Sequence, residues 1–479
     1  MTKVRDLVVI GGGAGGLVVA SVAAQLGLEV TLVNKEEAMG GDCLHYGCVP
    51  SKALLKSASV AHTIREAHRW GLNSAEPEID MQAVNGAIKK AIDTIQVHDS
   101  RERFEALGCE VLTGEARFTS PTQVEVAGRK ITAKRFVIAT GSYAWIPPIE
   151  GLQQVGFLTN EDMFSLPALP KSMIILGGGP IGVEMAQAYA RLGTKVTIVE
   201  LAPRLLFRMD AEASDILADV LASEGVSIVL NNEVVKVAEL EDPELEDPRQ
   251  GNIKQVTLKD GSTLQAETLL VAIGRRPAVE SLDLEKANID VDNRGIKVDR
   301  KMLTSNNKVY ACGDVTGVMP LTHVAELQAG VVIANLIFKM PKKISYDVVP
   351  AVVYTDPEVA QVGISVEQCE KLKAGEIHRF EISQLDRAVT DNNKAGVAKI
   401  LTDKGRIVGA HIIAPHAGEM IHELALAVQE KMKVSKITSL VHAYPSYSQL
   451  NKRLAGQYYK DRLFSPFTKK MVGLLNRLF

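Results

Sequence analysis

The chain contains two copies of one glycine pattern, and each copy lies between a predicted strand and a predicted helix. The first copy is in "DLVVIGGGAGGLVVASVAAQLGLEVTLVN", and the second is in "SMIILGGGPIGVEMAQAYARLGTKVTIVE", about 165 residues later. The glycines of the two Gly-x-Gly-x-x-Gly patterns are Gly11, Gly13, Gly16, Gly177, Gly179 and Gly182. Two complete strand–helix–strand units predict an α/β protein with two Rossmann-like dinucleotide-binding domains.

The glycines and the end of each second strand explain the predicted chemistry. The first glycine allows a tight turn, the second lets the backbone approach a pyrophosphate, and the third lets the helix pack closely on the strand. The second strand ends at Asn34 in the first unit and at Glu200 in the second. The Glu200 carboxylate suits a ribose 2′-hydroxyl and repels a 2′-phosphate, so we predict NADH rather than NADPH, although Arg204 follows closely. The Asn34 amide is the weaker ribose acceptor.

The composition excludes several classes of protein. A chain of 479 residues with 46% hydrophobic and 23% charged residues is typical of a soluble globular protein with roughly three domains. A net charge of −3 gives no general affinity for nucleic acid. The N-terminus runs directly into a strand, and no apolar run has the length of a membrane span. Five cysteines do not suggest a secreted disulfide scaffold, so we expect a cytoplasmic protein.

Two cysteines, Cys43 and Cys48, are separated by four residues in "GGDCLHYGCVPSKALL", just before a predicted helix. They are consistent with a metal clip, a structural crosslink, or a disulfide that opens and closes during turnover. Zinc usually requires a second cysteine pair or nearby histidines. The chain has no second pair, so a zinc site is disfavoured and we predict no resident metal. In a reducing cytoplasm such a pair is more often catalytic or metal-binding than structural.

Further motifs occur in a characteristic order. They are "FVIATGS" at 136–142, "VAIGRRP" at 271–277, "YACGD" at 310–314 and "VPAVVYTDPEVAQVG" at 349–363. Together with the glycine units and the cysteine pair, they make the chain resemble the pyridine nucleotide–disulfide oxidoreductases over nearly its full length. This family includes dihydrolipoamide dehydrogenase, glutathione reductase and mercuric reductase. The resemblance implies a homodimeric enzyme with FAD on the first unit, NAD(P)H on the second and a redox-active Cys43–Cys48 disulfide.

The resemblance also implies the domain organisation. We expect an FAD-binding domain (1–150 and 275–345), an NAD(P)-binding domain (151–274), an α+β dimerisation domain (346–459) and an amphipathic tail (460–479). Inside the second domain, the acidic, Pro-bearing segment 238–252 is predicted to be an exposed loop.

Site residues are implied in the same way. Cys48 would be the charge-transfer thiolate beside the flavin, and Cys43 the interchange thiol that attacks the substrate. Lys52 and Glu184 would pair beside the flavin, although the sequence alone suggests two solvated surface charges. Further cofactor contacts are implied for Asp314 at the ribityl chain, Thr140 and Gly141 near the pyrophosphate, Ala116 near the adenine, and Val234 and Gly274 at the nicotinamide nucleotide.

The cysteine motif departs from the family pattern at two positions. Asp42 stands where relatives usually carry Thr, and its carboxylate would be repelled by a pyrophosphate unless it points away. His45 stands where relatives usually carry Asn. An imidazolium there would stabilise a thiolate, but simple local packing is the favoured interpretation.

The segment "LVHAYPSYSQLNKR" changes the expected substrate. Tyr444 and Gln449 stand where dihydrolipoamide dehydrogenase and glutathione reductase carry a general acid–base His and its orienting Glu. A phenol with a pKa of about 10 is a poor proton shuttle at neutral pH. His442 is a disfavoured replacement. A Tyr here and the stretch 385–400 resemble mercuric reductase, but the absence of a C-terminal cysteine pair and of an N-terminal metal-binding domain weakens a dedicated role in mercury detoxification.

The sequence therefore leaves the acceptor open. A small disulfide, a thiophilic metal ion such as Hg(II), or a quinone that takes electrons directly from the flavin all fit. One alternative is a disulfide reductase of the dihydrolipoamide dehydrogenase type. Another is a redox-sensing or membrane-associated flavoprotein without turnover, which the intact cysteine pair and the Lys52–Glu184 combination disfavour. Cys109, Cys312 and Cys369 are predicted to pack in the interior.

The last segment, "DRLFSPFTKKMVGLLNRLF", has apolar residues at helical spacing with Lys469, Lys470 and Arg477 between them. Such a helix fits a membrane surface or the apolar seam of a dimer. We favour protein packing from the sequence.

Overall fold

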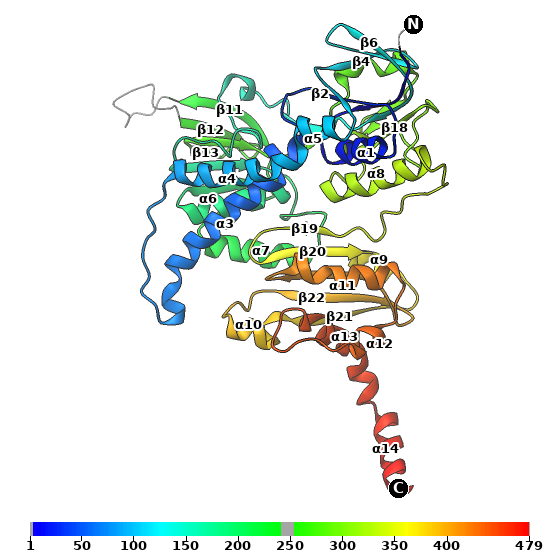
Figure 1. Cartoon of the computed structure of the whole chain (residues 1–479). Helices are drawn as coiled ribbons and strands as arrows, with labels where there is room; N and C mark the ends of the chain where they lie inside the picture. Colours follow the sequence, from blue (N-terminus) through cyan, green and yellow to red (C-terminus); the bar gives the residue numbers. More distant parts are fainter. Residues whose placement is uncertain (1–2, 241–252, 479) are drawn as a thin grey trace.

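The computed structural model describes residues 3–240 and 253–478. Two α/β bodies lie side by side above a third, α+β body, and the C-terminal helix points away from all three (Figure 1). The predicted fold class is therefore confirmed.

The first body is built on a largely parallel sheet with the order β3-β2-β1-β6-β5-β4, in which β18 also pairs with β6. Its strands are β1 Arg5–Ile10, β2 Val30–Asn34, β3 Glu110–Thr113, β4 Ala116–Ser120, β5 Gln123–Val126, β6 Arg129–Ile138 and β18 Val309–Ala311. The apolar run of β1 is completely buried. Small residues of α1 (Ala14–Gln25) let this helix pack tightly between the sheet and α8 (Thr322–Leu336).

The second body repeats this arrangement with a parallel sheet in the order β10-β9-β8-β14. Its strands are β8 Ser172–Leu176, β9 Lys195–Val199, β10 Ser227–Val229 and β14 Thr268–Val271, and its helices are α6 Pro180–Leu192 and α7 Ala211–Ser223. An antiparallel sheet of β11 Val234–Leu240, β12 Ile253–Leu258 and β13 Thr263–Ala266 extends from it. The predicted loop 238–252 was wrong at its start, because 238–240 complete β11 by pairing with β12. The rest of that segment lies outside the described residues.

The chain leaves the first body and returns to it through one antiparallel pair of short strands, β7 (Ser142–Ala144) and β15 (Arg275–Pro277). The returning chain forms β16 Val291–Asp292 and β17 Gly295–Ile296 before it adds β18 to the first sheet. Consequently, two motifs that are about 130 residues apart in the sequence lie next to each other at the junction of the two bodies.

The third body is an antiparallel sheet with the order β19-β20-β23-β22-β21. The strands are β19 Ala351–Val353, β20 Glu358–Gly363, β21 Gly375–Glu381, β22 Val397–Asp403 and β23 Arg406–Ala414. The helices are α9 Val366–Glu370, α10 Asp386–Thr390, α11 Ala417–Gln429, α12 Val434–Ser439, α13 Gln449–Leu463 and α14 Pro466–Leu478. Apolar residues of α11, α12 and α13 bury this sheet, whereas α14 contributes no buried residue.

A shared core fixes the helix that carries Cys48 relative to the other bodies. The short α2 (Gly41–His45) leads into α3 (Cys48–Arg65), which packs against α6 and α4 (Met81–Gln96). Leu54 of α3, Val183 of α6 and Val353 of β19 belong to one buried cluster. Each such side chain stabilises the assembly by about 1.5–3 kcal/mol when fully buried. This cluster therefore fixes the position of α3 relative to the second glycine unit and to the third body.

Candidate redox site

The glycine loops have the same backbone in both units. Gly11 and Gly177 adopt φ of +111° and +108°, which non-glycine residues rarely do. A Cβ on Gly16 would lie 1.9 Å from the Gly11 carbonyl oxygen, and a Cβ on Gly182 would lie 1.9 Å from the Gly177 carbonyl oxygen. These four glycines are therefore required by close packing of each helix on its strand.

The middle glycine of each pattern faces open space instead. A Cβ on Gly179 would meet no atom within 4 Å, and a Cβ on Gly13 would meet its first neighbour only at 3.7 Å. Neither α1 nor α6 has an acidic residue in its first turn. Exposed backbone at the positive end of a helix is suited to a diphosphate. Both loops therefore fit the dinucleotides that the patterns predict.

The residues at the strand ends are held by the loops that they face. The Asn34 side-chain oxygen accepts the Gly12 N–H at 3.0 Å, and its amide donates to two carbonyls of the following turn. The Glu200 carboxylate accepts the N–H groups of Gly178 and Ala202 at 2.6 and 2.7 Å. Arg204 is turned to the ring and carbonyl of Phe207.

A tight turn brings the two cysteines together. Gly40, with φ of +112°, donates its N–H to the Gly12 carbonyl at 2.7 Å and so ties α2 to the first glycine loop. A Cβ on Gly47 would lie 3.0 Å from the Asp42 carbonyl oxygen and 3.2 Å from the Cys43 Cα. The missing side chain at this position lets the chain fold back, so that Cys48 begins α3 beside Cys43. Both cysteines are thiols in the structure.

The surroundings favour ionisation of Cys48 over that of Cys43. Its hydrogen bond with Cys43, a second one with Thr322 and the charge of Lys52 together lower the pKa of Cys48 to about 6, against the opposing effect of burial. The same hydrogen bond and burial raise the pKa of Cys43. The Cys48 Sγ lies 3.3 Å from the hydroxyl of Thr322, the first residue of α8. A helix N-terminus also favours an anion at this place.

Lys52 and Glu184 form an ion pair with an N–O distance of 2.9 Å. Lys52 lies one turn after Cys48 on α3, and Glu184 is a buried residue of α6. The second carboxylate oxygen accepts the backbone N–H of Tyr354 at 2.9 Å, and the Lys52 ammonium lies 4.5 Å from the centre of the Tyr354 ring. The interpretation of these two residues as solvated surface charges is thus wrong, since tertiary contacts join them.

A polar chain connects the cysteine motif to Asp314, which begins the turn 314–316 after β18. The Asp42 carboxylate pairs with Arg275 at 2.9 Å and accepts a hydrogen bond from Asn160 at 2.9 Å. Arg275 donates to the Ser142 hydroxyl at 2.8 Å, and that hydroxyl donates to Asp314 at 2.7 Å. Burial raises the pKa of Asp314. The Asp42 charge is therefore neutralised within the protein and need not repel a pyrophosphate.

The remaining predicted cofactor contacts lie at or next to the ends of strands. Thr140 and Gly141 connect β6 to β7, and the Thr140 hydroxyl donates to the Ala278 carbonyl at 2.7 Å. Gly274, with φ of +153°, lies between β14 and β15, and Ala116 and Val234 begin β4 and β11. Their contacts with a ligand stay predictions.

His45 of the cysteine motif and His442 of the segment before α13 each contact a local partner. His45 binds the Met39 carbonyl through Nε2 at 2.9 Å, in agreement with the packing interpretation. The buried His442 side chain lies 3.2 Å from Glu423 within the third body. This buried position opposes its use as a replacement base. As predicted, Cys109, Cys312 and Cys369 are buried.

Tyr444, in contrast, is 67% exposed on the segment between α12 and α13, and Gln449 is the first residue of α13. A hydrogen bond to Asp386 and the charge of that carboxylate raise the pKa of the Tyr444 phenol. The phenol is thus protonated at neutral pH.

Sequence reasoning missed several residues of the site: Thr322, Arg275, Asn160, Ser142 and Tyr354. Arg275, Ser142 and Tyr354 lie inside the motifs at 271–277, 136–142 and 349–363, and Thr322 opens an apolar helix shortly after Asp314, so these four carried a weak signal. Over residues 3–240 and 253–478, no group of three or more His, Cys, Asp or Glu side chains is placed to hold a metal ion. No helix in those ranges has the length and apolar character to cross a bilayer.

The fold and the site together define a flavin-dependent disulfide reductase. The family model for pyridine nucleotide-disulphide oxidoreductases matches residues 5–329, and the model for the dimerisation domain of the same family matches residues 349–454. The chain belongs to this family and is an FAD-dependent, pyridine-nucleotide-linked enzyme. The dimerisation domain supports formation of a homodimer.

Individual relatives come from more than one branch. A mercuric reductase of Lysinibacillus sphaericus is 32% identical over 463 residues, which cover 95% of this chain and 83% of the relative. A mitochondrial dihydrolipoyl dehydrogenase of Pisum sativum is 33% identical over 466 residues, with coverage of 94% and 91%. A Cu(II) complex of the HOCl-induced flavoprotein disulfide reductase RclA from Escherichia coli superimposes with a TM-score of 0.84 at 27% identity, covering 94% of this chain and 99% of that one.

Proposed function

We propose that this homodimeric enzyme takes electrons from NADH and delivers them through the Cys43–Cys48 pair to a soft metal ion. When bound at the first glycine loop, FAD supplies the hydride-accepting and electron-relaying chemistry between the nucleotide and the cysteines. The pair of Lys52 with the buried Glu184 holds an ammonium one helical turn from Cys48. The lowered pKa of Cys48 keeps its sulfur ionised at neutral pH, while Cys43 is the thiol left to meet the acceptor.

One observation supports a metal ion rather than a disulfide as the acceptor: a protonated phenol stands where dihydrolipoamide dehydrogenase and glutathione reductase carry an imidazole. Reduction of a disulfide releases a thiolate that a general acid protonates, and Tyr444 with its raised pKa is poor at exchanging that proton at pH 7. A soft metal ion held by the two sulfurs takes two electrons from them: the Cys43 proton is released when the ion binds, the Cys43–Cys48 disulfide forms, and the metal leaves reduced with no leaving thiolate to protonate. In a homodimer, we propose, the exposed Tyr444 of one protomer approaches the cysteine pair of the other.

The experiment compares NADH oxidation with Hg(II), with lipoamide and with a benzoquinone as acceptors. We expect the native enzyme to turn over Hg(II) fastest. Tyr444→His should raise lipoamide turnover by about a hundredfold, the lower end of what a positioned acid–base group contributes. Tyr444→Phe is the matched control that removes the hydroxyl and adds no base, so lipoamide turnover should stay low.

Two outcomes contradict the proposal. Lipoamide turnover by the native enzyme that equals Hg(II) turnover would show that no acid–base group is needed at position 444. A benzoquinone rate that exceeds both and survives Cys48→Ser would show that the flavin serves the acceptor directly.

The preference for NADH is also a proposal. It rests on the Glu200 carboxylate, which stands at the strand end beside Gly178, and on the contacts that turn Arg204 toward Phe207.

A further inference from the structure

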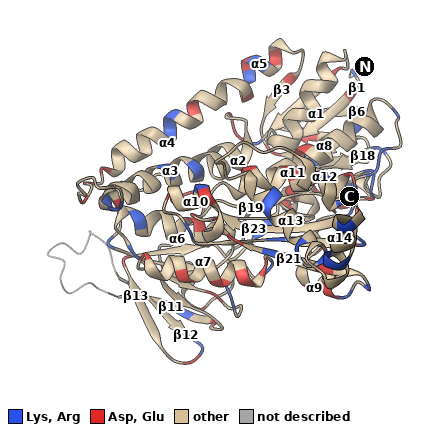
Figure 2. Ribbon diagram, turned by 90° about the horizontal axis from the view of Figure 1, so that it is seen from below, with Lys and Arg blue, Asp and Glu red and all other residues tan. Residues whose placement is uncertain are grey.

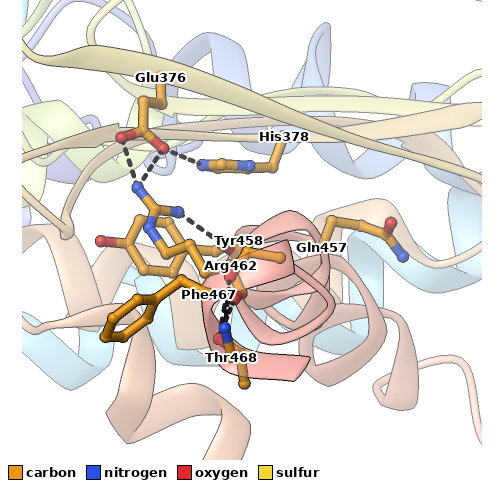
Figure 3. Close-up of a pocket in the computed structure, with 8 residues that line it drawn as sticks. Glu376, His378, Gln457, Tyr458, Arg462, Phe467 and Thr468 are labelled. Atoms are coloured by element: carbon orange, nitrogen blue, oxygen red, sulfur yellow. Dashed lines mark hydrogen bonds and ion pairs between the residues drawn. The ribbon is translucent and has the colours of Figure 1, made fainter. Parts of the chain in front are cut away.

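The C-terminal helix α14 has its own start signal and a fixed attachment to the third body. Ser465 caps it by accepting the Thr468 N–H at 3.2 Å, and Pro466 occupies its first turn. At the junction with α13, Arg462 binds the Glu376 carboxylate with N–O distances of 2.7 and 2.9 Å and lies 3.8 Å from the centre of the Tyr458 ring (Figure 3). The end of α13, from which α14 continues, is thus fixed to the dimerisation domain.

The apolar side of α14 is uncovered in the single chain. No residue of α14 is buried, and Phe467, Leu474 and Leu478 are 76%, 60% and 68% exposed. With Met471 they are spaced by four, three and four residues and therefore form one stripe along the helix. A helix of 13 residues is marginal in water without a surface that covers its apolar stripe. This stripe therefore implies an occupant.

The charges on the other side of α14 identify the chemistry of that occupant. The helix carries Lys469, Lys470 and Arg477 and no acidic residue, whereas the whole chain has a net charge of −3. Figure 2 shows Lys and Arg along α14 in a view where both signs are mixed over the rest of the protein. An apolar stripe with Lys470 and Arg477 along one edge, on a helix whose charges are all positive, matches an interface that is apolar inside and negative at its rim. An anionic lipid bilayer has this structure.

We infer that α14 lies in the surface of an anionic bilayer and holds the enzyme there. The helix is too short to cross a membrane, and it points away from both nucleotide-binding bodies (Figure 1). Membrane contact through α14 therefore leaves the redox site to react with acceptors in solution. The polar side of the helix would find few anionic partners in a second α14, because two copies present the same positive charges to each other. This inference does not depend on the identity of the acceptor.

The test is sedimentation of the full-length, FAD-loaded protein with vesicles of phosphatidylcholine alone and of phosphatidylcholine with about 30% phosphatidylglycerol. We expect binding to the anionic vesicles, little binding to the neutral ones, and release by high salt. Leu474→Asp should lower the partition coefficient at least about tenfold, because it places a carboxylate in the apolar stripe. Lys469→Glu with Lys470→Glu should also lower it by at least about tenfold, since each lysine near an anionic surface contributes about 1 kcal/mol.

The matched control is Lys342→Glu with Lys343→Glu, another exposed lysine pair with the same change in charge, on the loop after α8. This variant should bind like the native protein, and all variants should keep the native rate of flavin reduction by NADH. Absence of vesicle binding, or equal binding to both vesicle types, would overturn the inference. It would also be overturned if Leu474→Asp dissociated the dimer in sedimentation-velocity runs and the native protein bound no vesicles, because the occupant would then be a second copy of the chain.

Discussion

The two glycine units share a backbone but differ in charge and in the segments that continue from them. In both, the residue at the strand end accepts the N–H of the second glycine in the GGG run, through an amide at Asn34 and through a carboxylate at Glu200. The loop geometry is therefore the same with either side chain. The charge offered to a ribose differs, and the first unit alone continues into the cysteine pair. The glycines thus suit each loop to a dinucleotide, whereas we propose that the residues after them select the dinucleotide and direct its electrons.

We expect the largest effect from substitution of the two cysteines, which follow the first glycine unit and have no counterpart after the second. Cys48→Ser should abolish turnover with metal ions and the long-wavelength charge-transfer band, while NADH still bleaches the flavin. Cys43→Ser is the matched variant. It keeps the Cys48 thiolate and a hydroxyl that hydrogen-bonds to it, so the band should be present even before NADH is added. Anaerobic absorption spectra check both, and a band that persists in Cys48→Ser would assign the thiolate to another cysteine.

Substitution of the equivalent glycines in the two units should impair different functions. Gly16→Ala and Gly182→Ala each place a Cβ at 1.9 Å from a carbonyl oxygen, so each should lower the free energy of unfolding by about 1–3 kcal/mol. Gly16→Ala should also purify without yellow colour, whereas Gly182→Ala should keep its flavin but lose reduction by NADH. Denaturant titrations and flavin spectra measure these effects. Loss of flavin in both variants would mean that the units do not act independently.

The difference in charge between the two strand ends gives a smaller effect. Glu200→Gln keeps an acceptor for the Gly178 N–H but removes the charge, so KM for NADH should rise about tenfold while NADPH is used better. The reciprocal change, Asn34→Asp, should leave the choice of nicotinamide nucleotide unchanged, because it lies in the other unit. Steady-state kinetics with both nucleotides decide this, and an unchanged preference in Glu200→Gln would place the selectivity elsewhere.

The charge-transfer band should depend on pH in one direction. The pKa of Cys48 is lowered to about 6, so its thiolate is present above that pH and is lost as the pH falls through it. In Cys43→Ser the band should therefore be titrated away in acid. Lys52→Met added to Cys43→Ser should move the midpoint of this titration to higher pH, because the variant lacks the ammonium that stabilises the Cys48 thiolate. A midpoint that stays in place would show that Lys52 does not stabilise the thiolate.

The smallest effect concerns the departure from the family pattern at Asp42. Asp42→Thr breaks the ion pair with Arg275. Because both side chains of this pair are partly exposed to solvent, the free energy of unfolding should fall by about 1 kcal/mol or less. Arg275 keeps its bonds to Ser142, and flavin should remain bound. Thermal unfolding of the FAD-loaded variant measures this, and loss of the flavin would show that the Asp42 charge supports the cofactor site.

Much of the fold was predictable because it depends on local patterns. The glycine spacing required a turn between a buried strand and a helix, and both turns have the expected backbone. The start of the 238–252 segment was mispredicted because β12 pairs with it, and strand pairing overrides the loop preference of an acidic stretch. The pairing of Lys52 with Glu184 had no local signal, since the two residues are 132 positions apart.

The sequence by itself determined the two nucleotide units and the position of the cysteine pair, because each is a matter of residue type at short spacing. Only the tertiary structure showed what lowers the pKa of Cys48: Cys43 hydrogen-bonds to it, and Thr322 reaches it from 274 positions away. It likewise decided that Arg275 neutralises Asp42 and that α14 lies uncovered. The physical reason is that hydrogen bonds and ion pairs act over a few ångströms in space, whatever the separation of their partners along the chain.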